Sequence, residues 1–124
     1  MNIEELREFC LSLKGAEESM PFDDEVLVFS IKGKMFCLTG ISNYEFIILK
    51  CDPEEAIELR EQYPEVSPGY HMNKKHWNSI RTDGSISDKV FQEWIRKSYD
   101  LVVAGLPKKI RRELGLLRDR KSVV

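Results

Sequence analysis

Residues 26–39 read VLVFSIKGKMFCLT, and this stretch decides the class of fold. Two runs rich in β-branched and aromatic residues flank Lys32-Gly33, which is the pattern of two strands joined by a tight turn. A third strand is expected over Glu45–Cys51, after a turn at Asn43-Tyr44. Because these connections are too short to hold crossover helices, the stretch predicts an antiparallel meander.

Helix signals lie on both sides of the strand region. Asn2 and Glu5 are spaced as in a capping box, and apolar residues recur at helical intervals over residues 2–14. Asp52-Pro53 followed by two glutamates predicts a second helix that runs to about Gln62. The acidic stretch between the first helix and the first strand is expected to be a loop.

The second half of the chain continues with mixed elements. Residues 64–75 are expected to be irregular, because Pro64, Pro68 and Gly69 interrupt them. The remaining signals predict a strand over His76–Arg81, a turn at Asp83-Gly84, a helix capped by Ser87 and a last helix from Leu106-Pro107. The whole pattern predicts one α+β domain over residues 1–117, with a mostly antiparallel sheet, helices packed on one face and a frayed tail over residues 118–124.

The composition is that of an ordinary globular domain. The chain has 124 residues, of which 42% are hydrophobic and 32% charged, so collagen-like and low-complexity classes are excluded. No apolar run approaches the roughly 20 residues of a membrane span, and the acidic N-terminus is unlike a signal peptide. We expect a cytoplasmic protein without a membrane partner, present as a monomer or weak dimer.

The three cysteines and the two histidines predict no catalytic or metal site. Cys10, Cys37 and Cys51 form no CxxC pair and lie in apolar runs, so we expect reduced core residues. A nucleophile pair with His71 or His76 has no local support, and the two histidines lack a third metal ligand nearby. The sequence also lacks GxSxG, P-loop, GxGxxG and HExxH motifs. We therefore expect neither enzymatic activity nor a cofactor.

Charge is distributed unevenly along the chain. The net charge is −2, but residues 1–67 hold 6 Lys and Arg against 15 Asp and Glu, while residues 68–124 hold 13 against 6. This asymmetry points to one face suited to an anionic partner and another that repels it. Alternatively, the two halves neutralise each other in the folded protein.

The densest stretch of chemically active residues is PGYHMNKKHWN at positions 68–78. Lysines can neutralise phosphates, Asn and His can hydrogen-bond phosphates or base edges, and Tyr or Trp can stack on a base. The candidates for nucleic-acid binding are Lys74, Lys75, His76, Trp77 and Asn78, with Tyr70 as a second stacking residue. In the structural alternative, Tyr70 and Trp77 fill the core and the lysines are merely solvated.

A second basic run lies in the last predicted helix. Lys108, Lys109, Arg111 and Arg112 would form a positive ridge there. The same residues could instead serve the helix itself, since cations near a C-terminus complement the helix dipole.

Several of these motifs together resemble the MmcQ/YjbR family of small bacterial proteins. The resemblance rests on Met35-Phe36 after Gly33-Lys34, on Leu49–Glu54, on Pro68–Asn78, on Ser98–Val103 and on Leu106–Lys109, and it covers about residues 1–114. It implies a CyaY-like fold, an antiparallel sheet flanked by helices. It also implies a likeness to a "double-wing" DNA-binding domain, with no established enzymatic activity.

The resemblance directs the functional hypothesis. Mapped onto this sequence, the implied surface would include the sheet and its loops, which adds Arg81 to the candidates in 68–78. The CyaY-like fold also raises the possibility of weak metal binding, because frataxin-type iron binding resembles an acidic ridge. The corresponding residues here are Glu4, Glu5, Glu8, Glu17, Glu18, Asp23, Asp24 and Glu25.

We therefore hypothesise sequence-tolerant DNA binding through the basic C-terminal half of the chain. The alternative is a protein-interaction module that presents the 68–78 segment to a protein partner. A weak metal site or an enzyme is less favoured by the sequence than either.

Overall fold

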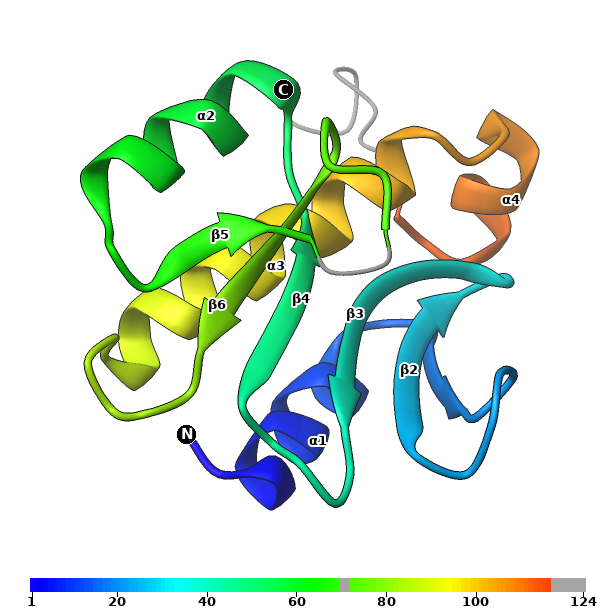
Figure 1. Ribbon diagram of the computed structural model, residues 1–124. Coiled ribbons are helices and arrows are strands. Elements are labelled where there is room, and N and C mark those ends of the chain that lie inside the picture. The colour runs from blue at the N-terminus through cyan, green and yellow to red at the C-terminus, as the bar shows by residue number, and fades with distance from the viewer. Residues whose placement is uncertain (70–71, 117–124) are drawn as a thin grey trace.

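The computed structural model describes residues 1–69 and 72–116, and the predicted tail over 118–124 lies outside them (Figure 1). The α+β prediction is confirmed. The elements in chain order are α1 (Ile3–Ser12), β1 (Ala16–Ser19), β2 (Val26–Ile31), β3 (Lys34–Gly40), β4 (Phe46–Lys50), α2 (Pro53–Gln62), β5 (Val66–Pro68), β6 (Trp77–Arg81), α3 (Asp88–Ala104) and α4 (Lys108–Glu113).

The six strands form one sheet in the order β1-β2-β3-β4-β6-β5, and every neighbouring pair is antiparallel. The predicted meander is therefore right for β2, β3 and β4 but incomplete. After β4 the chain passes through α2 to the far edge of the sheet, and β6 then returns between β4 and β5. The two edge strands, β1 and β5, lie in stretches that the sequence predicted to be loops.

The helices begin where the sequence places their caps. The Asn2 side chain accepts from the Glu5 N–H at 2.8 Å and the Glu5 carboxylate accepts from the Asn2 N–H at 2.9 Å, which completes the capping box of α1. Asp52 caps α2 ahead of Pro53, and Ser87 caps α3. These ends satisfy N–H groups that have no partner within the helix.

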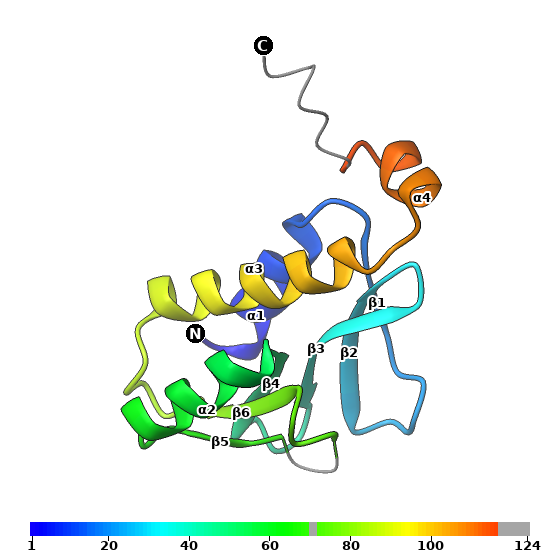
Figure 2. The same cartoon turned by 90° about the horizontal axis from the view of Figure 1, so that it is seen from above.

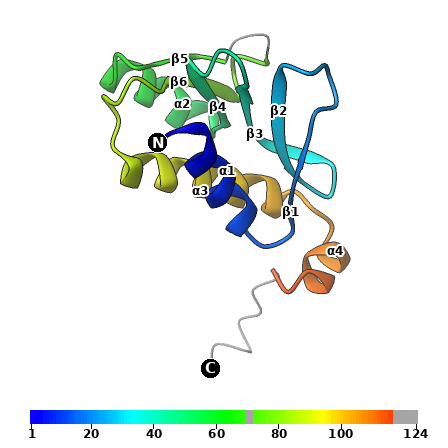
Figure 3. The ribbon, with the colours of Figure 1, turned by 90° about the horizontal axis from the view of Figure 1, so that it is seen from below.

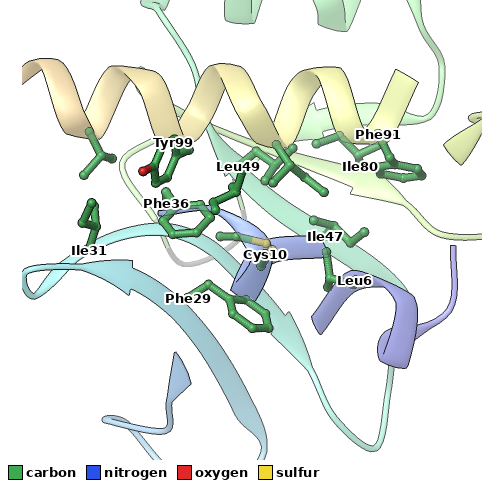
Figure 4. Close-up of a cluster of buried hydrophobic side chains, with 14 of the residues drawn as sticks. Leu6, Cys10, Phe29, Ile31, Phe36, Ile47, Leu49, Ile80, Phe91 and Tyr99 are labelled. Atoms are coloured by element: carbon green, nitrogen blue, oxygen red, sulfur yellow. The ribbon is translucent and has the colours of Figure 1, made fainter. Parts of the chain in front are cut away.

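The main core lies between the sheet and the helices on one of its faces. Figures 2 and 3 show α1 and α3 on the same side of the strands. Among the fully buried residues, Leu6 and Cys10 come from α1, Phe29 and Ile47 from the sheet, and Phe91 from α3 (Figure 4). Cys37 is also buried, so two of the three cysteines pack as predicted.

A bulge in β3 brings Phe36 into contact with α3. The register shifts so that Phe29 pairs with Cys37 and Ser30 with Met35, which leaves Phe36 as the extra residue. Phe36 turns into the core, where its ring meets that of Tyr99 edge to face at 5.4 Å between centroids.

The opposite face of the sheet, here called the free face, is covered by no helix in the part of the chain described. Its own small cluster consists of the buried residues Val28, Leu38 and Trp77, with Met35, Ile48 and Met72 packed against them. The loop after β5 contributes Met72, so Trp77 is covered by the curved sheet and this loop together.

Candidate nucleic-acid interface

The segment from Pro68 to Asn78 is held in place by its own backbone. The Gly69 N–H donates to the Trp77 carbonyl at 2.7 Å, and the His76 and Trp77 N–H groups both donate to the Asn73 carbonyl. A Cβ at Gly69 would lie 2.6 Å from the Trp77 Cβ, so only glycine fits there. Pro68 and Gly69 therefore close a tight loop against the start of β6.

Two of the predicted contact residues are not accessible. Trp77 is only 8% exposed and Asn78 is fully buried, so neither side chain is available to a nucleic acid. Trp77 packs in the free-face cluster, and Asn78 turns toward α2. The predicted stacking by Trp77 thus loses its basis, and the structural alternative is right for this residue. Tyr70, like His71, lies outside the described residues.

Arg60, which the sequence analysis did not single out, positions this loop from α2. Its Nε donates to Asn78 Oδ1 at 2.7 Å, and its terminal nitrogen donates to the carbonyls of Lys74 and Trp77. The Asn78 amide in turn donates to the Ala56 carbonyl at 3.3 Å. The one feature of the sequence that could have pointed to Arg60 is that it is the sole cation of the acidic helix α2.

The remaining residues of the motif are accessible. Lys74 and Lys75 are exposed at the tip of the loop, and His76 is half-buried beside them. The Asn73 side chain accepts from the Lys75 N–H at 3.0 Å, which fixes the backbone that carries both lysines. These lysines are thus presented on an ordered loop.

Further lysines reach the same end of the sheet from the acidic half of the sequence. Because the strands are antiparallel, the β2–β3 turn, the end of β4 and the start of β6 lie together, and Lys50 pairs directly with Trp77. The turn carries Lys32 and Lys34. Sequence reasoning missed these three lysines, although the register of the predicted hairpin already puts them at one end.

A cavity of about 420 Å³ opens among these lysines. Its walls are the side chains of Lys34, Met35, Lys50 and Trp77, the C-terminal part of α3 with Leu101 and Val102, and the backbone at Gly33 and Gly105. Leu101 is 39% exposed and lines this cavity. The end of α3 contributes about half a negative charge, which the two lysines exceed.

The basic ridge of α4 lies beside the β2–β3 turn, as Figures 1 and 2 show. Leu114, which follows α4, and Ile31, at the end of β2, both lie close to Gly15. The exposed residues of the predicted ridge are Lys108, Lys109 and Arg112, whereas Arg111 is half-buried with its Nε unpartnered among the described residues. Loop and ridge both lie toward the upper part of Figure 1, with α4 on the helix side of the sheet and the loop on the opposite side in Figures 2 and 3.

We call this region the basic end, comprising Lys32, Lys34, Lys50, Lys74, Lys75, Lys108, Lys109 and Arg112. The ion pairs of the described residues involve the N-terminus, Arg7, Arg96 and Lys97, and none of the residues of the basic end. Two nearby carboxylates, Glu18 and Glu55, are each held by a cation outside the set, Arg7 and Lys97 respectively. Asp52 accepts from the first N–H groups of α2.

Arg81 is separated from this region. It ends β6, at the other end of the strand from Trp77, and lies beside Glu45 and Asp83. Asp83 has a pKa below its usual value, mainly because Ser85 hydrogen-bonds to it, with a smaller effect from Arg81. Arg81 thus does not join Lys74 and Lys75 in one interface.

The loops at this other end of the strands form the acidic end, comprising Asp23, Asp24, Glu25, Glu45 and Asp83. They lie in the β1–β2, β3–β4 and β6–α3 loops, at the lower edge of Figure 1. The charge asymmetry of the sequence is therefore arranged by the ends of the sheet and not by the two halves of the chain.

The described residues contain no group of three His, Cys, Asp or Glu side chains that could hold a metal ion. The half-buried thiol of Cys51 has its pKa raised to about 11, mainly by burial and then by Glu55. A thiol with so high a pKa is a poor nucleophile at neutral pH. In the described part of the chain, no helix combines the length and apolar character of a membrane span.

These observations define a class: a small α+β protein with an antiparallel sheet covered on one face and charges separated between the ends of the sheet. Comparison with known sequences identifies the family within this class. A family model described as YjbR matches residues 11–101, and the chain belongs to the YjbR family, as its motifs indicated.

Relatives match over nearly their full length. The chain is 39% identical to YbdF of Escherichia coli O157:H7 over 97% of this chain and 92% of that protein. It is 33% identical to YjbR of Escherichia coli K12 over 92% and 98%. The crystal structure of DR2400 from Deinococcus radiodurans, with a DUF419 domain, superposes with a TM-score of 0.88 at 41% identity, covering 94% of this chain and 89% of that one. None of these names states an activity.

Proposed function

We propose that the protein binds DNA through phosphate contacts made by the basic end. The observation that carries this proposal is that eight cations from four separate segments lie toward one end of the sheet, without ion pairs among the described residues, and that two of them, Lys34 and Lys50, line a cavity there. A local excess of cations attracts a polyanion more strongly than the net charge of −2 suggests.

The expected mode of binding is largely independent of sequence. With Trp77 and Asn78 buried, the loop offers lysines and the half-buried His76. Lysine contacts to phosphates position a protein on DNA but carry no base information. The cavity between Lys34 and Lys50 would seat one backbone phosphate, with its sugar against Met35 and Leu101.

The proposal is tested by fluorescence anisotropy with labelled duplex and single-stranded DNA at several salt concentrations. Two double variants remove charge from the basic end, Lys74→Ala/Lys75→Ala and Lys32→Ala/Lys34→Ala. A matched control, Arg81→Ala/Lys89→Ala, removes two exposed cations from elements at the acidic end. Each basic-end variant should weaken binding and lower the slope of log K against log salt by about 2.

The control variant should bind DNA like the wild type. Absence of binding even at low salt, where electrostatic attraction is strongest, would overturn the proposal. An equal loss in the control would show that binding follows total charge and would reject the basic end as the interface.

A further inference from the structure

An apolar groove crosses the free face of the sheet near the acidic end. It consists of two adjoining hollows of about 310 and 530 Å³ that share Gly40 and Ile48. Phe22, Val26, Leu38 and Met72 line the first hollow, and Phe46, Pro68 and Ser79 line the second. We call the two hollows together the free-face groove.

Exposed apolar side chains concentrate beside this groove. Phe22, which lines the first hollow, is 61% exposed, and Ile41, next to Gly40, is 40% exposed. The Ile41 N–H donates to the Glu25 carbonyl at 2.8 Å, so the loops that carry these residues lie side by side. An exposed apolar patch next to a hollow of similar character marks an interaction site better than scattered apolar residues do.

The charge around the groove selects the partner. Asp23, Asp24 and Glu25 directly follow Phe22, and Glu45 lines the second hollow. Arg81 lies at this side of the rim, beside Phe46 and Glu45. Four carboxylates against one guanidinium leave the rim negative, which repels a nucleic acid and attracts a cationic chain.

We infer that the free-face groove binds a cationic amphipathic segment of a partner protein. Its apolar side chains would cover Leu38 and Ile48 and pack against Phe22, while its Lys or Arg side chains would meet Asp24 and Glu45. The Glu25 carboxylate already accepts from the Ser42 hydroxyl at 3.0 Å, which ties the two loops of the rim together. The inference does not depend on DNA binding, since no cation of the basic end lines either hollow. Met72 and Pro68 belong to the segment that carries Lys74, but the acidic rim lies at the other end of the sheet.

The test selects peptides from a displayed library of random dodecapeptides at 0.15 M salt. From the peptides that bind the wild type, those that also bind the variant Phe22→Ser are removed. This variant alters an exposed residue and should leave the fold intact. The surviving peptides should be rich in both apolar and Lys or Arg residues. The most enriched one is then synthesised with a fluorescent label as the probe.

The probe should bind the wild type and the control variant Ile57→Ser, which alters an apolar residue on α2 that is 54% exposed. Its affinity should fall at least fivefold in Phe22→Ser and in Asp24→Lys/Glu45→Lys. Amide shifts in NMR spectra should move at Gly40, Ile48 and Met72.

Three results would overturn the inference. The first is that no peptide distinguishes the wild type from Phe22→Ser, and the second is that the selected peptides are acidic. The third is a dimer at 0.15 M salt that Phe22→Ser dissociates, because the groove would then be covered by a second copy of the chain.

Discussion

Asn78 joins three parts of the fold through one buried side chain. It accepts from Arg60, donates to the carbonyl of Ala56, and its amide also lies 3.8 Å from the Cys51 sulfur. Through Arg60 the network continues to the carbonyl of Lys74, so α2 holds the loop of the basic end. The 68–78 motif resembles a binding site in the sequence, but its buried residues Trp77 and Asn78 stabilise the fold.

Replacing Asn78 by Ala should therefore destabilise the protein by about 2–3 kcal/mol, because a partly buried guanidinium and a buried carbonyl lose a partner. Urea unfolding followed by circular dichroism measures this change. The control Asn43→Ala, at an exposed position, should stay within about 0.5 kcal/mol. Equal stability of the two variants would contradict the assigned network.

Cys51 gives the stability of the protein a dependence on alkaline pH. Its pKa rises from 9.0 in the unfolded reference to about 11 in the folded protein, first because of burial. The folded state therefore retains the proton longer, and the thiol's contribution is complete below pH 9 and is lost as the pH rises toward 11. Denaturant titrations from pH 8 to 11 should show a smaller loss of stability for Cys51→Ala than for the wild type.

At the scale of residues, the sequence could indicate that residues 68–78 contain many side chains able to bind a nucleic acid, but not which of them are accessible. Trp77 is buried by Val28 and Leu38, which lie 49 and 39 positions earlier in the chain. Contacts of that separation leave no local signal. The exposure of Lys74 and Lys75 follows from the turn residues around them and was predictable.

At the scale of elements, local signals were sufficient where an element carries its own cap or turn. The hairpin at Gly33 and the helices α1, α2 and α3 appear where their residues place them. β1 was missed because Ala-Glu-Glu-Ser has weak strand propensity and pairs only along the open edge of β2. β5 was missed because Pro68 is a strand breaker that an edge strand tolerates.

Ser98 shows how α3 is fixed to the sheet. Its hydroxyl donates to the carbonyl of Phe36, at the β3 bulge, and accepts from the Lys50 N–H at 2.9 Å, at the end of β4. We expect Ser98→Ala to cost about 1–3 kcal/mol, because two backbone groups lose their partner. Thermal or urea unfolding tests this value against Ser12→Ala, an exposed serine whose loss should change stability little. A neutral Ser98→Ala would mean that these backbone groups find other partners.

At the scale of the whole molecule, the uneven charge of the sequence was visible, but its arrangement was not. Lys32, Lys34 and Lys50 belong to the acidic half of the chain, yet the antiparallel register brings them beside Lys74 and Lys75. Arg81 belongs to the basic half and lies among carboxylates. Only the sheet topology, with β6 inserted next to β4, decides these positions.

If the basic end is the DNA interface, net charge should matter little. The variant Asp24→Lys/Glu45→Lys adds four charges and changes the net charge from −2 to about +2. The five-residue strand β6 alone separates the two ends by roughly 13 Å or more, beyond the Debye length of about 8 Å at physiological salt. Anisotropy titrations at 0.15 M salt should thus show less than a threefold change in affinity for DNA, and a tenfold gain would contradict the localised interface.

The separation of charge between the ends of the sheet also bears on how the protein behaves at a charged surface. A protein with a net charge of −2 is ordinarily expected to bind an anion-exchange resin and not a cation-exchange resin. Here the lysines of the basic end, which form no ion pair among the described residues, can face a sulfated matrix while the carboxylates of the acidic end face the solvent. Retention on heparin or on a cation-exchange resin at neutral pH follows, with every bound molecule turned the same way.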